Sequence, residues 1–81
     1  MRTYRRIEHK QGSSITGDYK LITEINGTTW KQWSEWEDGT VTRYTERTLK
    51  EMGWHSLDEF LRTKQRVCKE IKVKFPFHLV N

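Results

Sequence analysis

The sequence predicts an α+β domain: an antiparallel, three- to four-stranded meander with one amphipathic helix packed on one face, in the order β-β-β-α-β. Three observations lead to this fold class. The dipeptides Asn26-Gly27 and Asp38-Gly39, both typical of hairpin turns, separate three β-prone runs. An apolar stripe with helical spacing follows at residues 57–71, and the last residues alternate between apolar and polar side chains. A helix on one face of an antiparallel sheet is a stable two-layer arrangement.

Strands are expected at residues 19–25, 28–36 and 40–47, which are rich in Thr, Ile, Val, Tyr and Trp. With two-residue type I′ turns, residue 25 faces residue 28 and residue 36 faces residue 41. The more apolar face is expected to face the core, and a one-residue slip in either turn would change this assignment. That face carries Tyr19, Leu21, Ile25, Trp30, Trp36 and Val41, with Gln32, Ser34, Arg43 and Arg47 among them.

The helix is expected to begin at Ser56-Leu57-Asp58-Glu59, a capping box followed by a long amphipathic run. Its apolar stripe consists of Leu57, Phe60, Leu61, Lys64, Val67, Cys68 and Ile71, with the Lys64 stem lying along the stripe. An earlier capping box at Thr48 is cut short after about one turn by Gly53. The alternation at residues 71–79 predicts a fourth strand, which Pro76 confines to a sheet edge or ends early.

Two units are expected along the chain. Residues 1–18 are interpreted as a basic N-terminal arm and loop, and residues 19–81 as a single α+β domain. Residues 11–18 are rich in Gly, Ser and Thr, which is typical of a loop. Residues 3–9 also fit one more short strand, so both interpretations of the N-terminus remain open.

Composition limits the class of protein. The chain has 81 residues, of which 33% are hydrophobic and 32% charged, so it is a lean but globular domain whose aromatic residues carry the core. No 18-residue apolar run is present, so no membrane partner is expected. A lone Cys68 and the lack of a secretory pattern favour a reducing, cytoplasmic location.

Positive charge concentrates at the two ends of the chain. There are 15 Lys and Arg against 11 Asp and Glu, a net charge of +4. This pattern predicts a small nucleic-acid-binding accessory protein, with DNA favoured over RNA, that makes mainly backbone contacts. The hypothesis requires the two ends to meet as one cationic surface; the alternative is a solvated helix face with Asp58–Arg62 and Arg66–Glu70 pairs. The predicted nucleic-acid-binding residues are Arg2, Arg5, Arg6, Arg62, Arg66, Lys69, Lys72 and Lys74.

A second hypothesis is a non-enzymatic protein-binding module, an inhibitor or adaptor of the kind encoded by phages and mobile elements. Trp33 and Tyr44 are expected as neighbours on the outer sheet face, beside Lys20 and Lys31. Such a group suits either a stacking platform for unpaired bases or an interface with a larger protein. The predicted edge strand at 73–79 suits strand addition, and a homodimer through this tail is compatible with both hypotheses.

No catalytic constellation is expected. His9, His55, His78 and Cys68 lack the close pairing of zinc ligands, and Cys68 is interpreted as a small core residue. No glycine-rich phosphate loop or pocketed carboxylate pair is recognisable. The sequence therefore predicts neither an enzyme nor a bound metal or cofactor.

Overall fold

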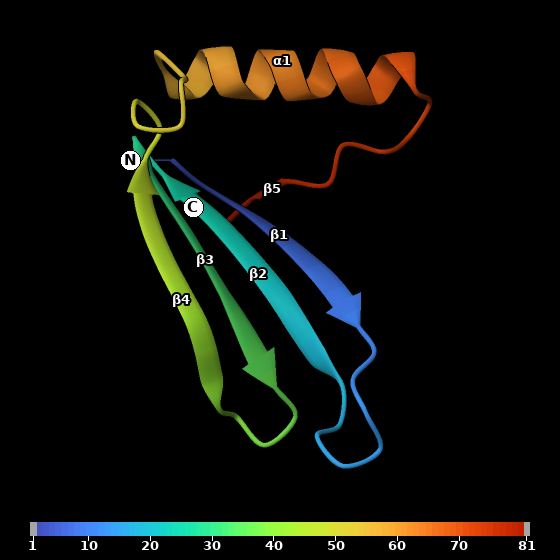
Figure 1. The fold of residues 1–81 in the computed structure, drawn as a ribbon. Coiled ribbons are helices and arrows are strands. Elements are labelled where there is room, and N and C mark those ends of the chain that lie inside the picture. Colours follow the sequence, from blue (N-terminus) through green and yellow to red (C-terminus); the bar gives the residue numbers. More distant parts are fainter. Residues whose placement is uncertain (1, 81) are drawn as a thin grey trace.

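The fold is a single five-stranded sheet with one helix. The computed structural model describes residues 2–80. Along the chain the elements are β1 (Thr3–Lys10), β2 (Tyr19–Asn26), β3 (Thr29–Trp36), β4 (Val41–Thr48), α1 (Leu57–Glu70) and β5 (His78–Leu79). The strands pair antiparallel in the order β4-β3-β2-β1-β5, and α1 lies across one end of the sheet (Figure 1). The predicted α+β class is confirmed.

The N-terminal segment is a full member of the sheet. β1 pairs with β2 over its whole length, from Thr3 opposite Asn26 to Lys10 opposite Tyr19. The expectation of a separate arm is therefore wrong for residues 3–10, and the alternative of an extra strand is confirmed. The physical reason is that β1 covers the hydrogen-bonding edge that β2 would otherwise expose. Residues 11–18 form the connecting loop, while Met1 and Asn81 lie outside the described residues.

The first hairpin turn lies one residue later than expected, yet the sheet faces are as predicted. Asn26 pairs with Thr29, so the loop is Gly27-Thr28, with φ +62° at Gly27. Ile25 therefore faces Trp30, not residue 28 as predicted. This change shifts the pairing by two residues, and an even shift leaves every side chain on its original face.

The second hairpin contains two irregularities that compensate each other. Its loop has three residues, 37–39, and Gly39 (φ +89°) donates its N–H to the Trp36 carbonyl at 2.9 Å. This places Val41 opposite Glu35, so Val41 lies on the outer face, 51% exposed, and its predicted core position is wrong. A bulge at Arg43 (φ 57°) then restores the predicted register, in which Trp30 faces Arg47.

The core occupies one end of the sheet. We call the face that α1 packs against the inner face and the opposite one the outer face. Phe60 of α1 makes edge-to-face contacts with Trp54 and Phe77, at ring-centroid distances of 5.3 and 5.7 Å. From the sheet, Ile25 is completely buried in this cluster. The buried members are Ile25, Leu49, Leu57, Phe60, Leu61 and Phe77, with Tyr4, Trp30, Trp54 and Phe75 packed against them.

The helix begins as predicted. The Ser56 hydroxyl accepts a hydrogen bond from the Glu59 N–H (3.1 Å), and the Glu59 carboxylate accepts one from the His55 N–H (2.9 Å). This reciprocal pattern satisfies two donors that a helix N-terminus leaves open. Lys64 extends over Trp54 and Phe60, with its ammonium 6.0 and 5.8 Å from the ring centroids. Its aliphatic chain therefore lies along the apolar stripe, as the sequence predicts.

The predicted tail strand forms only at its end. β5 consists of His78–Leu79, which pair with Arg5 and Tyr4 of β1. The preceding residues are irregular: Lys72 has φ 58°, and Pro76 lacks the N–H that a ladder needs. The segment runs back beneath α1 toward β1 (Figure 1), because Phe77 is buried in the core. Strand addition at 73–79 therefore lacks the extended edge that it was predicted to use.

We expect Arg43→Gly to leave the free energy of unfolding unchanged or to raise it by up to about 1 kcal/mol, because a left-handed conformation strains any residue with a Cβ. Arg47→Gly, in the regular part of β4, is the matched control and should lower it by about 1 kcal/mol. Chemical denaturation of both variants measures the difference. Equal losses in the two variants would contradict the bulge at Arg43.

Candidate functional site

The basic residues in and just before β1 pair with carboxylates of the same chain. Arg2 Nη2 lies 2.8 Å from Asp58 Oδ1 at the start of α1, and this hydrogen bond raises the pKa of Arg2. Arg5 forms an ion pair with Glu24. Because side chains alternate along a strand, Arg5 lies on the outer face while its neighbour Arg6 lies on the inner face.

The basic residues of the C-terminal third lie on α1 and on the segment that follows it. Among residues 2–80, the Asp58–Arg62 and Arg66–Glu70 pairs of the alternative interpretation are not formed, and Asp58 pairs with Arg2 instead. Arg2 and Arg6 thus lie on the inner side of the sheet, Arg2 against α1, whereas Arg5 lies on the outer face. The sequence led us to expect that all three would join the last third of the chain in one cationic surface. Arg5 is excluded from such a surface by its position, and Arg6 alone lines a common groove with Lys74. The exposed basic residues of the last third of the chain are Arg62, Arg66, Lys69, Lys72 and Lys74.

The outer face carries a row of apolar side chains across four strands. Trp33 and Tyr44 are neighbours there, as predicted, with ring centroids 6.1 Å apart and an interplanar angle of 27°. Ile22 pairs with Trp33 and is buried, whereas Ile7 at the β1 end is 46% exposed and was missed in the sequence. The signal available was its place as the single aliphatic residue of residues 3–9, a segment that fits a strand. We call Ile7, Ile22, Trp33 and Tyr44 the apolar row.

Carboxylates accompany both aromatic rings of this row. Trp33 Nε1 donates to Glu35 at 3.0 Å, and the Tyr44 hydroxyl donates to Glu46 at 2.9 Å. The bond to Glu46 raises the pKa of the Tyr44 hydroxyl. The predicted neighbours Lys20 and Lys31 are also on this face, directly opposite Glu35 and Glu24. Negative charge beside each ring disfavours a phosphate backbone and suits contact with a protein.

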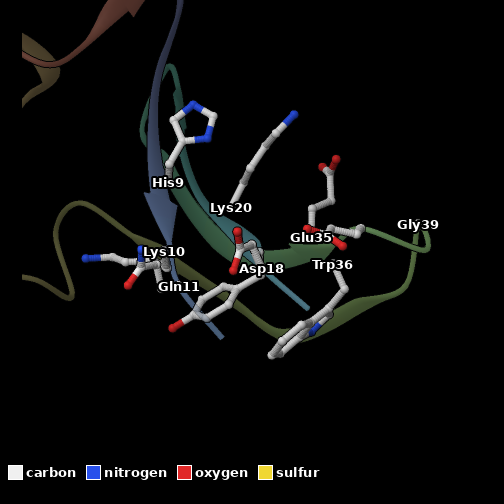
Figure 2. A pocket seen from close by; sticks show the side chains of 10 residues that line it. His9, Lys10, Gln11, Asp18, Lys20, Glu35, Trp36 and Gly39 are labelled. Atoms are coloured by element: carbon white, nitrogen blue, oxygen red, sulfur yellow. The ribbon is translucent and has the colours of Figure 1, made fainter. Parts of the chain in front are cut away.

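A hollow of about 790 Å³ lies at the hairpin end of the sheet. Figure 2 shows side chains of opposite charge around it, among them Lys20, Asp18 and Glu35, with Trp36 at its lower side. The Trp36 ring packs against Tyr19 with centroids 4.6 Å apart. Since positive and negative groups are mixed here, the hollow offers no excess charge for an ionic ligand.

Half of the apolar stripe of α1 is not used by the core. Leu57, Phe60 and Leu61 are buried, but Val67 is 40% and Ile71 62% exposed. The expectation that the whole stripe is core is therefore wrong for its second half, because this part of the helix extends past the core. What remains is a groove of about 610 Å³ between α1, the following segment and the inner face. We call it the helix groove.

Apolar and cationic side chains line the helix groove together. Its walls include Trp30 and Trp54 as well as Val67, Ile71 and Val73. The unique cysteine, Cys68, also lines it and is partly exposed, not a core residue as predicted.

The charged groups of the helix groove are predominantly positive. Arg6, Lys64 and Lys74 face a single carboxylate, Glu8, whose Oε1 lies 3.1 Å from Arg6 Nη2 and 3.4 Å from Lys10 Nζ. The Arg6 Nε atom is buried with no hydrogen-bond partner among the described residues. A buried donor left unpaired is costly to the folded chain.

Across residues 2–80, no three His, Cys, Asp or Glu side chains gather in the arrangement of a metal site. In the same part of the chain, α1 falls short of the length and hydropathy that a membrane-spanning helix requires. Comparisons with protein-family models, curated proteins and solved structures find no match to this chain. Its surfaces are therefore interpreted from their own chemistry.

We expect Ile71→Ala to change the free energy of unfolding by less than about 0.5 kcal/mol, because Ile71 contributes little to the core. Leu61→Ala, at a buried position of the same stripe, should lower it by about 2–5 kcal/mol. Urea denaturation followed by tryptophan fluorescence measures both. A loss at Ile71 as large as that at Leu61 would show that the groove is closed in solution.

Proposed function

We propose that this chain is a non-enzymatic protein-binding module, an adaptor or inhibitor that takes a segment of another polypeptide into the helix groove. The observation that carries this proposal is the unused half of the α1 stripe, with Val67 and Ile71 exposed above a concave apolar surface. Helices bury such stripes against another element, and within residues 2–80 no element covers Val67 and Ile71 in this way. An apolar groove rimmed by polar groups suits an amphipathic peptide segment.

The charge of the groove indicates the chemistry of the partner. Three cations, Arg6, Lys64 and Lys74, line it against the single carboxylate of Glu8, which already has two basic neighbours. We therefore propose an acidic segment with interspersed apolar residues as the occupant. The lone Cys68 is compatible with a cytoplasmic partner.

A random peptide library displayed on phage and selected on the immobilised chain tests this proposal without a known partner. We expect the recovered peptides to combine apolar residues with Asp or Glu. Ile71→Glu and Lys64→Glu should each weaken their binding at least about tenfold, because one places a charge on the apolar wall and the other reverses a favourable charge. Bound peptide should also slow the reaction of Cys68 with a thiol reagent.

Ile15→Glu is the matched control, since Ile15 is 93% exposed in the loop that joins β1 to β2. It should bind the recovered peptides as the unmodified chain does. Recovery of basic peptides, or equal binding to Ile71→Glu, would contradict the groove as the site.

Nucleic-acid binding is the second candidate function, now through α1 alone. The observation in its favour is the exposure of Arg62, Arg66 and Lys69, for which no ion pair is formed within residues 2–80. Cations that are not neutralised locally can replace the counterions of a phosphate backbone. The carboxylates of the outer face would not oppose contacts made from the helix.

Fluorescence anisotropy with a duplex DNA tests this candidate at about 50 mM and about 200 mM salt. We expect affinity to fall with salt, and the double variant Arg62→Glu/Arg66→Glu to lose most of the binding. Arg5→Gln, on the outer face and already paired with Glu24, is the control. Millimolar affinity at the lower salt, or no salt dependence, would exclude this role.

A further inference from the structure

On the outer face, positively and negatively charged residues alternate from one strand to the next. The strand pairing aligns one residue from each of β1 to β4, in the order Arg5, Glu24, Lys31 and Glu46. The next row along the strands is the apolar row. Beyond it, Lys20 of β2 lies beside Glu35 of β3. The apolar row is thus flanked on one side by four alternating charges and on the other by the Lys20–Glu35 pair, which lies between His9 of β1 and Val41 of β4.

We propose that two copies of this chain associate through their outer faces, related by a two-fold axis parallel to the strands. This rotation places β1 of one copy opposite β4 of the other, and β2 opposite β3. Each cation of a charged row then meets a carboxylate: Arg5 faces Glu46 of the second copy, and Lys31 faces Glu24 of the second copy. Lys20 faces Glu35 of the second copy in the same way. The interface is isologous, as in most closed dimers.

The apolar row supplies the centre of this interface. Under the same rotation, Trp33 faces Ile22 of the second copy, and Tyr44 faces Ile7 of the second copy. Tyr44 and Ile7, 55% and 46% exposed in the single chain, gain the most burial. An apolar centre with a charged rim, rich in Trp, Tyr and Arg, matches the anatomy of protein interfaces.

The charge of the face permits self-association despite the net charge of the chain. The chain carries +4, but the paired positions of the outer face balance three cations, Arg5, Lys20 and Lys31, with three carboxylates, Glu24, Glu35 and Glu46. The excess positive charge lies on α1 and the segment after it, on the far side of each sheet. The paired rows of the two copies are therefore neutral and complementary to each other.

The size of the face sets the expected strength. Four strands of eight residues form a surface about 19 Å wide and about 27 Å long, or about 500 Å² for each copy. Two copies bury about 1,000 Å², the lower limit for a specific interface, so we expect a weak dimer. Facing sheets cross at about −30°, which displaces the rim rows by a few ångströms, within the reach of Lys, Arg and Glu side chains.

This proposal goes beyond the proposed function and rests on a different face. The helix groove remains open on the outside of each copy, so the dimer presents two grooves. Peptide binding in the groove and association through the sheet can fail independently, because the experiments use different variants and readouts.

Sedimentation velocity from about 10 µM to about 1 mM tests the association. We expect the average mass to rise with concentration from one chain toward two. Trp33→Ala should weaken association at least about tenfold. Trp36→Ala is the matched control, because Trp36 lies on the inner face of the same strand and should leave association unchanged. A chain that is monomeric throughout, or equal effects of the two variants, overturns the proposal.

A charge exchange between two copies tests the geometry. Neither Lys20 nor Glu35 forms an ion pair within residues 2–80. Lys20→Glu alone brings carboxylates together across the axis, and Glu35→Lys alone brings ammonium groups together, so each variant should be monomeric at concentrations where the unmodified chain dimerises. An equimolar mixture should dimerise again, because residues 20 and 35 are then of opposite charge at both contacts. Circular dichroism establishes that each variant is folded, and a mixture that stays monomeric overturns this arrangement.

Discussion

The packing of α1 against one end of the sheet is the contact on which the rest of the molecule depends. Phe60 and Leu61 of the helix meet Ile25 of β2 and Phe77 of the tail in one cluster. Because all of these residues lie near the first half of α1, the second half of the helix extends past the core. The helix groove is a direct consequence of this off-centre packing, as is the return of the tail beneath the helix (Figure 1).

Local pairing of charges changes what the composition of the chain implies. The positive ends of the sequence suggested a shared cationic surface, but Arg2, Arg5 and Arg6 each pair with a carboxylate of their own chain. Such exposed pairs contribute little to stability, yet they reduce the charge available to a phosphate backbone. The cations of α1 and of the segment after it remain able to contact a phosphate backbone. Nucleic-acid binding is therefore a hypothesis about the helix and not about the whole molecule.

The two faces of the sheet owe their different chemistry to register. An even shift in the first hairpin and two opposed single shifts in the second leave Trp33 outside and Trp30 inside, although the exact turns differ from those expected. Had the bulge at Arg43 not compensated for the longer loop, the rest of β4 would have turned its other face to the core. The charged rows of the outer face exist only because the register is restored.

Local patterns in the sequence determined the elements that depend on neighbouring residues: the three strands of the central meander, the capping box at Ser56 and the helix that follows it. The outer position of Trp33 also followed from alternation, whereas that of Tyr44 agrees with the prediction because the bulge at Arg43 restores the expected register. Only the tertiary structure decided the place of β1, the reduction of the tail strand to His78–Leu79, and the half of the α1 stripe that is buried. These features depend on contacts between residues far apart in the chain, which periodicity does not encode. A stripe of apolar residues predicts that a helix has a face to bury, but the shape of the opposing surface determines how much of that face is covered.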